Sequence, residues 1–238
     1  MLFALVNGEK FEAMPKTEGK CPLCNEIFYS KCGDINIWHW AHYKDNSCDS
    51  WYEPESEWHR NWKMVFGRNN SEIIISRDEA RHIADIQTRE NVIIELQNSP
   101  IPRPTIYQRE SFYGERMIWI VNGKHFKHNF RVQQSFPGSY SRNEKNYEDR
   151  HGIFTKNTEG LAPHSKDDFR FIWDWPRKSW SGVQRNVFVD CGAENLFWSL
   201  DGMGTKNGRG RKTSKEKFIK KYGGNLELLT TLIDKSNI

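Results

Sequence analysis

Two acidic side chains interrupt hydrophobic segments in which a sheet would normally bury aliphatic residues. The stretch "HIADIQTRENVIIELQNS", residues 82–99, carries Asp85 and Glu95 among Ile, Val and Leu. Strand alternation directs Glu95 and Gln97 to the same face. If "TRE" closes an antiparallel hairpin centred on position 89, Asp85 opposes Ile93 and is the diagonal neighbour of Glu95. The two carboxylates would then reach one ion, which would offset the free-energy cost of burying them.

A hard divalent cation accounts for both acids. Mg²⁺ takes oxygen ligands, typically one or two carboxylates with water and substrate phosphate oxygens. Mg²⁺ or Mn²⁺ held by Asp85 and Glu95 would polarise a phosphodiester and supply an activated water, while Gln97 could orient that water. The alternative is structural: Asp85 would pair with Arg81 or Arg89 at a sheet edge, and Glu95 would form a surface ion pair. The pair of acids within apolar strands favours the metal.

The helical segment "ESEWHRNWK" adds polar groups beside an apolar stripe. His59 and Lys63 share one helical face, where they could contact a phosphate, and Glu57 could complete the metal shell. For each of them taken singly, a solvated helix face is the alternative.

A second group of residues has the spacing of zinc ligands. Two Cys and two His in paired motifs form the ligand set of a closed tetrahedral site; they are Cys21, Cys24, His39 and His42. Cys32 and Cys48 are alternatives to either His. Free Cys that pack as small hydrophobes, with His39 as a core residue between two Trp, are the structural alternative. The paired spacing favours structural zinc.

Composition bounds the class of protein. The 238 residues contain ten Trp and carry a net charge of +4, which argues for a folded chain and permits an anionic partner. No apolar run reaches the length that a bilayer needs, and the opening residues do not form a signal peptide. We therefore expect a cytoplasmic protein, in which clustered Cys more often bind metal than form disulfides.

Periodicity predicts the elements that position these residues. An opening strand turns at Asn7-Gly8. A helix begins near Pro54, with Trp58, Trp62, Val65 and Phe66 on its apolar face. Further strands are expected over 72–76, 81–87, 91–97 and 116–123, and a helix over 105–114 whose shared face carries Ile106, Arg109 and Tyr113. The order after Pro54 is thus α, β, β, β, α, β.

Three consecutive segments follow from this pattern: a strand and zinc-binding module over 1–52, a core over 53–124 and a C-terminal mixed region over 125–238. The last contains the polar stretch "SFPGSYSRNEKNYEDRHG", residues 135–152, and the basic, Gly-rich "GTKNGRGRKTSKEKFIKKYGG", residues 204–224. Thr213 and Glu216 have capping-box spacing for a short helix there. The basic stretch would suit a phosphate backbone or a solvated surface loop.

The ordered motifs of the first 125 residues resemble the competence protein CoiA-like family. They are "CPLC", "WHWAH" in place of HF-x-H, "ESEWHRNWK", "RHIADI", "VIIELQNSPI" and "IYQRESFYGERMIWIVN". The resemblance implies a PD-(D/E)XK, restriction-endonuclease-like core of mixed α+β or α/β class. It also implies that the CPxC and HFxH elements bind zinc.

Site residues carry over position by position. Asp85 is similar to the superfamily's metal-binding acid, Glu95 to the acid of the ExK element, and Glu57 to the acid of the first helix. Gln97 stands where most of the superfamily has Lys, although the CoiA-like pattern is itself ExQ. His59 and Lys63 are then candidates to supply the missing charge. Arg109, with Lys63, is expected to meet the DNA backbone.

The resulting expectation is a Mg²⁺- or Mn²⁺-dependent DNA nuclease with a structural zinc. It would act on DNA during natural transformation or in defence against foreign DNA, with recombination or defence proteins as partners and without a membrane. The alternative is a zinc-stabilised DNA-binding scaffold without turnover.

Overall fold

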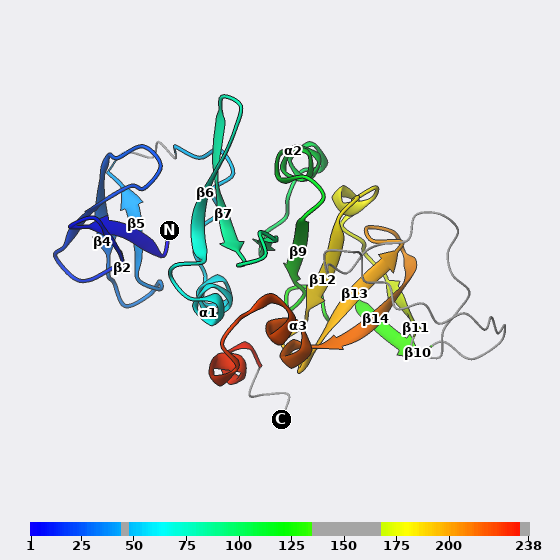
Figure 1. The fold of residues 1–238 in the computed structure, drawn as a ribbon. Helices are drawn as coiled ribbons and strands as arrows, with labels where there is room; N and C mark the ends of the chain where they lie inside the picture. The colour runs from blue at the N-terminus through cyan, green and yellow to red at the C-terminus, as the bar shows by residue number, and fades with distance from the viewer. Residues whose placement is uncertain (44–47, 135–167, 234–238) are drawn as a thin grey trace. The chain divides into compact units, whose positions relative to one another are not determined.

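The structure of the protein is a computed structural model that describes residues 1–43, 48–134 and 168–233 (Figure 1). The polar stretch from residue 135 to 152 lies outside the described residues. The fold is a mixed α+β arrangement. It divides into two compact units, one formed by residues 1–94 with 222–232 and the other by 95–221 with 233–238. Residues 222–232 lie with the first unit although they follow most of the second unit in sequence. The three segments expected from the sequence stay a prediction.

The first unit opens with a five-stranded antiparallel sheet in the order β2-β1-β3-β4-β5. Its strands are β1 (Phe3–Val6), β2 (Glu9–Glu12), β3 (Glu18–Lys20), β4 (Ile27–Lys31) and β5 (His39–His42). The turn predicted at Asn7-Gly8 is confirmed: both residues have positive φ, 52° and 86°, and Val6 pairs with Glu9. Phe28 and Trp40 are buried in the core of this sheet.

Helix α1 (Glu57–Phe66) continues the first unit. Its predicted apolar stripe is confirmed, since Trp58, Trp62, Val65 and Phe66 are buried. The helix begins later than expected, because the Ser56 hydroxyl caps it by accepting a hydrogen bond from the His59 N–H. The 3₁₀ helix η2 (Leu226–Leu232) packs against α1, where the Asn61 side chain donates to the Thr231 carbonyl at 3.1 Å.

An antiparallel meander follows: β6 (Ser71–Arg77), β7 (Ala80–Gln87) and β8 (Ile93–Gln97). Gln87 pairs with Ile93 and Ile86 with Ile94, so the second hairpin is centred on position 90. The prediction that Asp85 opposes Ile93 is therefore wrong by two residues along β7. The turn is set by Thr88, whose backbone N–H donates to the Val92 carbonyl while its hydroxyl accepts from the Val92 N–H.

Helix α2 (Arg103–Tyr113) and strand β9 (Met117–Asn122) complete the order predicted from Pro54 onward. The expected shared face of α2 is confirmed, since Ile106, Arg109 and Tyr113 are buried. Strand β9 is buried along its whole length and pairs in parallel with β12 (Asn186–Asp190). Burial on both faces explains its continuous apolar sequence.

The remaining strands of the second unit are antiparallel to their neighbours: β10 (Phe130–Gln134), β11 (Asp168–Trp173), β13 (Asn195–Asp201) and β14 (Asn207–Ser214). The hydrogen-bonded strand order is β10-β11-β14-β13-β12-β9-β8-β7-β6. The 3₁₀ helix η1 (Lys178–Trp180) lies between β11 and β12, and helix α3 (Lys215–Tyr222) follows β14. The Phe218 ring of α3 packs edge-on against Phe188 of β12.

The basic, Gly-rich stretch forms β14 and α3, so the short helix expected there is confirmed and the alternative of a surface loop does not hold. A Cβ at Gly208 would lie 2.5 Å from the Phe171 ring, and one at Gly210 would lie 2.4 Å from the Phe197 ring. The missing side chains therefore let aromatic rings lie against β14. The helix cap is also shifted by one residue, because the Lys217 N–H donates to the hydroxyl of Ser214 rather than of Thr213.

Arg209 and Arg211, the two arginines of β14, are engaged within the second unit. Arg209 donates to Asp201 at 2.9 Å, and Arg211 donates to Asp168 at 2.8 Å. Their guanidinium groups therefore neutralise buried or partly buried carboxylates. Across the residues that the structure describes, no helix combines the length and the apolar character needed to cross a bilayer.

Candidate functional site

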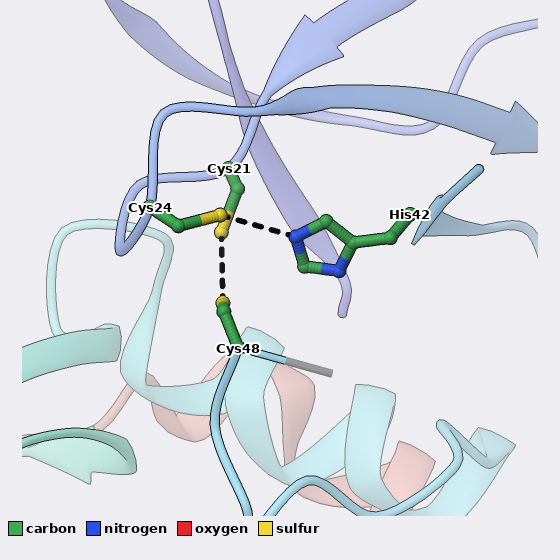
Figure 2. Close-up of side chains that lie close together, drawn as sticks. All are labelled: Cys21, Cys24, His42 and Cys48. Carbon is green, nitrogen blue, oxygen red and sulfur yellow. Dashed lines mark hydrogen bonds between the residues drawn. The ribbon is translucent and has the colours of Figure 1, made fainter. Parts of the chain in front are cut away.

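Four side chains of the first unit converge on one point (Figure 2). Their potential ligand atoms all lie within 4.8 Å of one another; they belong to Cys21, Cys24, His42 and Cys48. The Cys21 and Cys48 sulfurs are 3.5 Å apart, and the Cys24 sulfur is 3.2 Å from His42 Nε2. A tetrahedral zinc with Zn–S bonds of about 2.3 Å separates its sulfurs by roughly 3.8 Å. The group thus has the dimensions of a zinc site.

Local structure aims the first two thiols at this point. Cys21 directly follows β3, and its carbonyl accepts from the Asn25 N–H at 2.9 Å while its N–H donates to the Glu26 carbonyl at 2.8 Å. Asn25 has a φ of 63°, which reverses the chain within this short turn. The Leu23 N–H also points at the Cys21 sulfur, at 3.4 Å. Such N–H donors favour the thiolate that a metal requires.

The donor chemistry fits a structural metal. Burial raises the pKa of the Cys21 thiol, and burial together with Cys21 raises the pKa of Cys48. Thiols packed in this way are unfavourable as free anions, whereas a bound Zn²⁺ deprotonates its thiol ligands outright. Burial lowers the pKa of His42, which favours the neutral imidazole that binds metal. Four protein ligands leave no open position, so the chemistry is structural.

The structure corrects one predicted ligand. His39 and His42 lie three residues apart on β5, and strand alternation sends side chains at that spacing to opposite faces. His42 faces the cysteines and packs edge-on against Phe28, while His39 Nδ1 is 2.9 Å from the Ile37 carbonyl. Cys48, which the sequence offered as an alternative ligand to a His, takes the fourth position. Cys32 packs instead against the core of the opening sheet.

The residue after Cys48 holds this segment to strand β7. Asp49 is buried, and its carboxylate accepts from the Ile83 N–H at 2.7 Å and lies 2.9 Å from His82 Nδ1. The Trp51 ring stacks on the His82 ring with centroids 3.3 Å apart. The fourth ligand is thereby placed by contacts that the CxxC and HxxH spacing does not reveal.

A second cluster of the first unit surrounds the buried ammonium of Lys63. Its Nζ lies 2.8 Å from a Glu55 oxygen, 3.0 Å from Glu72 and 3.3 Å from Asp85. Burial alone would lower the pKa of Lys63, but the three carboxylates raise it well above its usual value. Glu72 also accepts from the backbone N–H groups of Leu2 and Phe3. Burial raises the pKa of Glu72, but Lys63 and these donors outweigh it and lower the pKa.

Asp85 is the most accessible carboxylate of this cluster. Its side chain is 21% exposed, against 2% for Glu55 and 3% for Glu72. The structure therefore brings together two of the predicted residues, Lys63 and Asp85, and adds two acids that the sequence analysis missed. Glu55 precedes α1 and Glu72 lies early in β6, where neither follows the apolar periodicity. The only available signal was an acid within an apolar strand in "SEIIIS".

The other predicted residues of α1 lie apart from this ammonium. Glu57 is exposed on the first turn of the helix. His59 is buried, with Nδ1 2.8 Å from the Ser56 hydroxyl and Nε2 3.6 Å from a Glu53 oxygen. These contacts anchor the imidazole at the start of α1.

The predicted residues of the second unit are also buried. Arg109 donates to Glu95 at 2.9 Å, with side chains 7% and 3% exposed, and its guanidinium lies over the Trp119 ring. Gln97 donates to the Ser99 carbonyl at 3.1 Å. Arg109 thus neutralises Glu95, and the expected contact of Arg109 with DNA and the expected metal at Asp85 and Glu95 stay predictions. Among the described residues, the Cys/His group is the one set of three or more ligands within coordinating range.

The comparison with protein families bears on the segment that holds the Cys/His group. Residues 5–50 match the family model "Competence protein CoiA, N-terminal domain". This segment contains all four residues of the Cys/His group and most of the five-stranded sheet. The comparison with curated proteins and the comparison with solved structures found no match.

Proposed function

We propose that this protein is a metal-dependent DNA nuclease that processes DNA in a competence-related role, with Asp85 and Glu95 as its catalytic acids. The CoiA match over residues 5–50 supports the competence-related role. The α, β, β, β, α, β order of α1 to β9 supports a PD-(D/E)XK type of core. The zinc site would stabilise the opening module of such an enzyme.

The observation that carries the proposal is the environment of Asp85. A carboxylate at the partly exposed edge of a buried, acid-rich cluster can reach a hydrated cation, whereas Glu55 and Glu72 are enclosed. Mg²⁺ or Mn²⁺ at Asp85 would supply charge to a phosphodiester and a more acidic water. The Lys63 ammonium lies 3.3 Å from the Asp85 carboxylate and pairs with it. In this proposal Gln97 orients the attacking water by hydrogen bonding.

A second candidate function is a zinc-stabilised DNA-binding scaffold without turnover. It is favoured because two groups of the proposed nuclease site form buried ion pairs within the protein. Lys63 bonds Glu55 and Glu72, and Glu95 is neutralised by Arg109. Residues committed to buried ion pairs can serve the fold alone. This candidate predicts DNA binding without cleavage.

A cleavage assay separates the two functions. Purified protein is incubated with labelled single-stranded, duplex and branched DNA, with and without Mg²⁺ or Mn²⁺. The proposal predicts metal-dependent cleavage that falls by at least about 100-fold in Asp85→Asn and in Glu95→Gln, since each change removes a charge used in the transition state.

The matched control is Asp78→Asn, in the β6–β7 turn of the same hairpin. Asp78 is exposed and has a φ of 51°, a conformation that Asn also adopts. This variant should cleave like the wild type. The catalytic assignment would be wrong if cleavage survived both acid substitutions. It would also be wrong if a folded, zinc-loaded wild type cleaved no DNA, and the scaffold function would then remain.

A further inference from the structure

The loop after β11 carries one tryptophan outward between two that point inward. Trp173 and Trp180 are fully buried, whereas Trp175 is 72% exposed. The Trp180 ring packs edge-on against Trp119 at 5.3 Å, and Trp173 stacks on Phe126 at 4.8 Å. The two buried rings fix the loop at both ends. Trp175 is thus presented to solvent from an anchored segment, where exposing so large a ring has no benefit for folding.

Trp175 forms one wall of a groove of about 750 Å³ within the second unit. Three cationic side chains line the same groove, Arg103, Lys178 and Lys206. Pro176 directly follows Trp175 and restricts the backbone there. An aromatic ring and several cations therefore face one space.

The cations come from three separate segments that backbone contacts hold in place. Arg103 begins α2, and its guanidinium occupies the space that a Cβ at Gly182 would fill, 2.8 Å away. Lys206 is held beside β11, because its carbonyl accepts from the Trp173 N–H at 2.8 Å. A Cβ at Gly204 would lie 2.4 Å from the Ser181 nitrogen, so glycine lets the two loops touch. Lys178 begins η1.

The groove keeps a positive charge because its carboxylate is already neutralised. Asp174 is the only acid that lines it among the described residues, and both Asp174 oxygens accept from Arg131, at 2.5 and 2.9 Å. Three cations therefore remain to attract an anion. A chain of phosphates suits three cations on separate segments better than one compact anion does.

We propose that this groove binds single-stranded DNA, with one base stacked on Trp175 and the flanking phosphates held by Arg103, Lys178 and Lys206. Base stacking on an exposed aromatic ring beside a basic groove is how single strands are bound without sequence preference. In a duplex the base faces are already stacked on one another, so Trp175 would have no free face to meet. The choice of DNA rests on the proposed function, whereas the choice of a single strand rests on the groove.

The test measures binding rather than cleavage. Fluorescence anisotropy follows a labelled oligothymidylate of about 16 nucleotides, the upper end of the site size for one single-strand-binding fold. No Mg²⁺ or Mn²⁺ is added, so the result does not depend on turnover. Trp175→Ala should weaken binding by about 5- to 150-fold, while Trp175→Tyr should keep most of the affinity because it keeps a stacking ring.

The salt dependence tests the cations independently. Single strands lose affinity with a slope of about −0.7 in log K against log salt for each phosphate neutralised, so three contacts give about −2. Lys178→Ala and Lys206→Ala should each make the slope shallower by about 0.7. Trp38→Ala and Lys217→Ala are the matched controls, since both residues are exposed and lie elsewhere. Both should bind like the wild type.

Several outcomes would overturn the inference. They are wild-type binding by Trp175→Ala, equal losses in Trp38→Ala, tighter binding of a duplex or an oligouridylate of the same length, and no binding by the wild type. If the groove variants behave as expected while no cleavage is seen with added metal, the nuclease proposal fails and the single-strand site stands.

Discussion

At the scale of single residues, the ammonium of Lys63 shows how a charge can be buried with several partners. Its side chain is 5% exposed and bonds two almost fully enclosed carboxylates, Glu55 and Glu72. Glu72 in turn accepts from the N–H groups of Leu2 and Phe3, so one carboxylate joins α1, β6 and β1. Removing one partner of such a network leaves an uncompensated charge behind.

This network makes the stability of the folded chain depend on pH. The pKa of Glu72 is lowered in the folded chain, so ionised Glu72 contributes stability above the pKa of the unfolded carboxyl, and that stability is lost as the pH falls through the folded value. Wild-type stability to urea should therefore drop between about pH 5 and pH 3. Glu72→Gln should cost about 3–5 kcal/mol at neutral pH and flatten part of this drop.

Glu79→Gln is the control for this acid dependence, because Glu79 is an exposed acid in the turn between β6 and β7. Its urea midpoints should follow those of the wild type at every pH. Equal pH slopes for wild type and Glu72→Gln would show that the carboxylate of Glu72 is not the group responsible.

At the scale of elements, strand β14 shows a glycine pattern that serves aromatic packing. Gly208 and Gly210 lie where the rings of Phe171 and Phe197 meet the strand. Those two rings also pack on each other, with centroids 5.8 Å apart. At these two positions the aromatic rings of β11 and β13 pack on the backbone of β14, while Arg209 and Arg211 bond carboxylates of the same two strands.

A methyl group at Gly210 should disturb this packing. In Gly210→Ala the new Cβ would lie 2.3 Å from the Trp198 carbonyl oxygen and 2.4 Å from the Phe197 ring. Overpacking of this kind typically costs about 1–3 kcal/mol, which urea denaturation would measure. Gly33→Ala is the control: no atom lies within 4 Å of a Cβ built there, so its stability should match the wild type.

The periodicity of apolar residues predicted the helices and strands better than it predicted which residues of other elements they contact. The apolar face of α1, the meander and the fully buried β9 follow from residue spacing alone. The register at Thr88 depends on one side-chain hydrogen bond, and the role of Gly210 depends on Phe197, which comes from another strand. A local pattern contains neither contact.

The ligands of the Cys/His group could be predicted only in part, because a local pattern does not contain contacts between distant segments. Cys21 and Cys24 share one turn, so their spacing is informative. His39 and His42 share a strand, where a spacing of three separates them, and Cys48 is placed by the contacts of Asp49 with β7. The HxxH spacing would bring both imidazoles to one metal in a helix but not on β5.

At the scale of the whole molecule, the chain divides into two compact units. Phe28, Trp40 and Trp62 are buried in the first unit, and Trp119 and Phe188 are buried in the second. The Cys/His group belongs to the first unit alone. Loss of its metal should therefore act on one unit.

Cys48→Ser tests both the ligand assignment and this independence. The wild type should carry about one zinc per chain, and Cys48→Ser should bind it at least about 10-fold more weakly. Metal analysis with limited proteolysis would detect the loss of zinc and new cleavage confined to residues 1–94 and 222–232. Cys32→Ser and His39→Ala are the controls and should keep their zinc. Zinc loss in His39→Ala but not in Cys48→Ser would reverse the assignment.

The return of residues 222–232 to the first unit has a consequence for the newly made chain. The Asn225 N–H donates to the Val65 carbonyl, and the hydrogen bond from Asn61 to Thr231 joins residues 170 positions apart. A ribosome delivers α1 long before it delivers its covering segment. The first unit, although begun first, is therefore completed only after residues 95–221 have been made, and its unfinished face is exposed to chaperones while most of the second unit is still being translated.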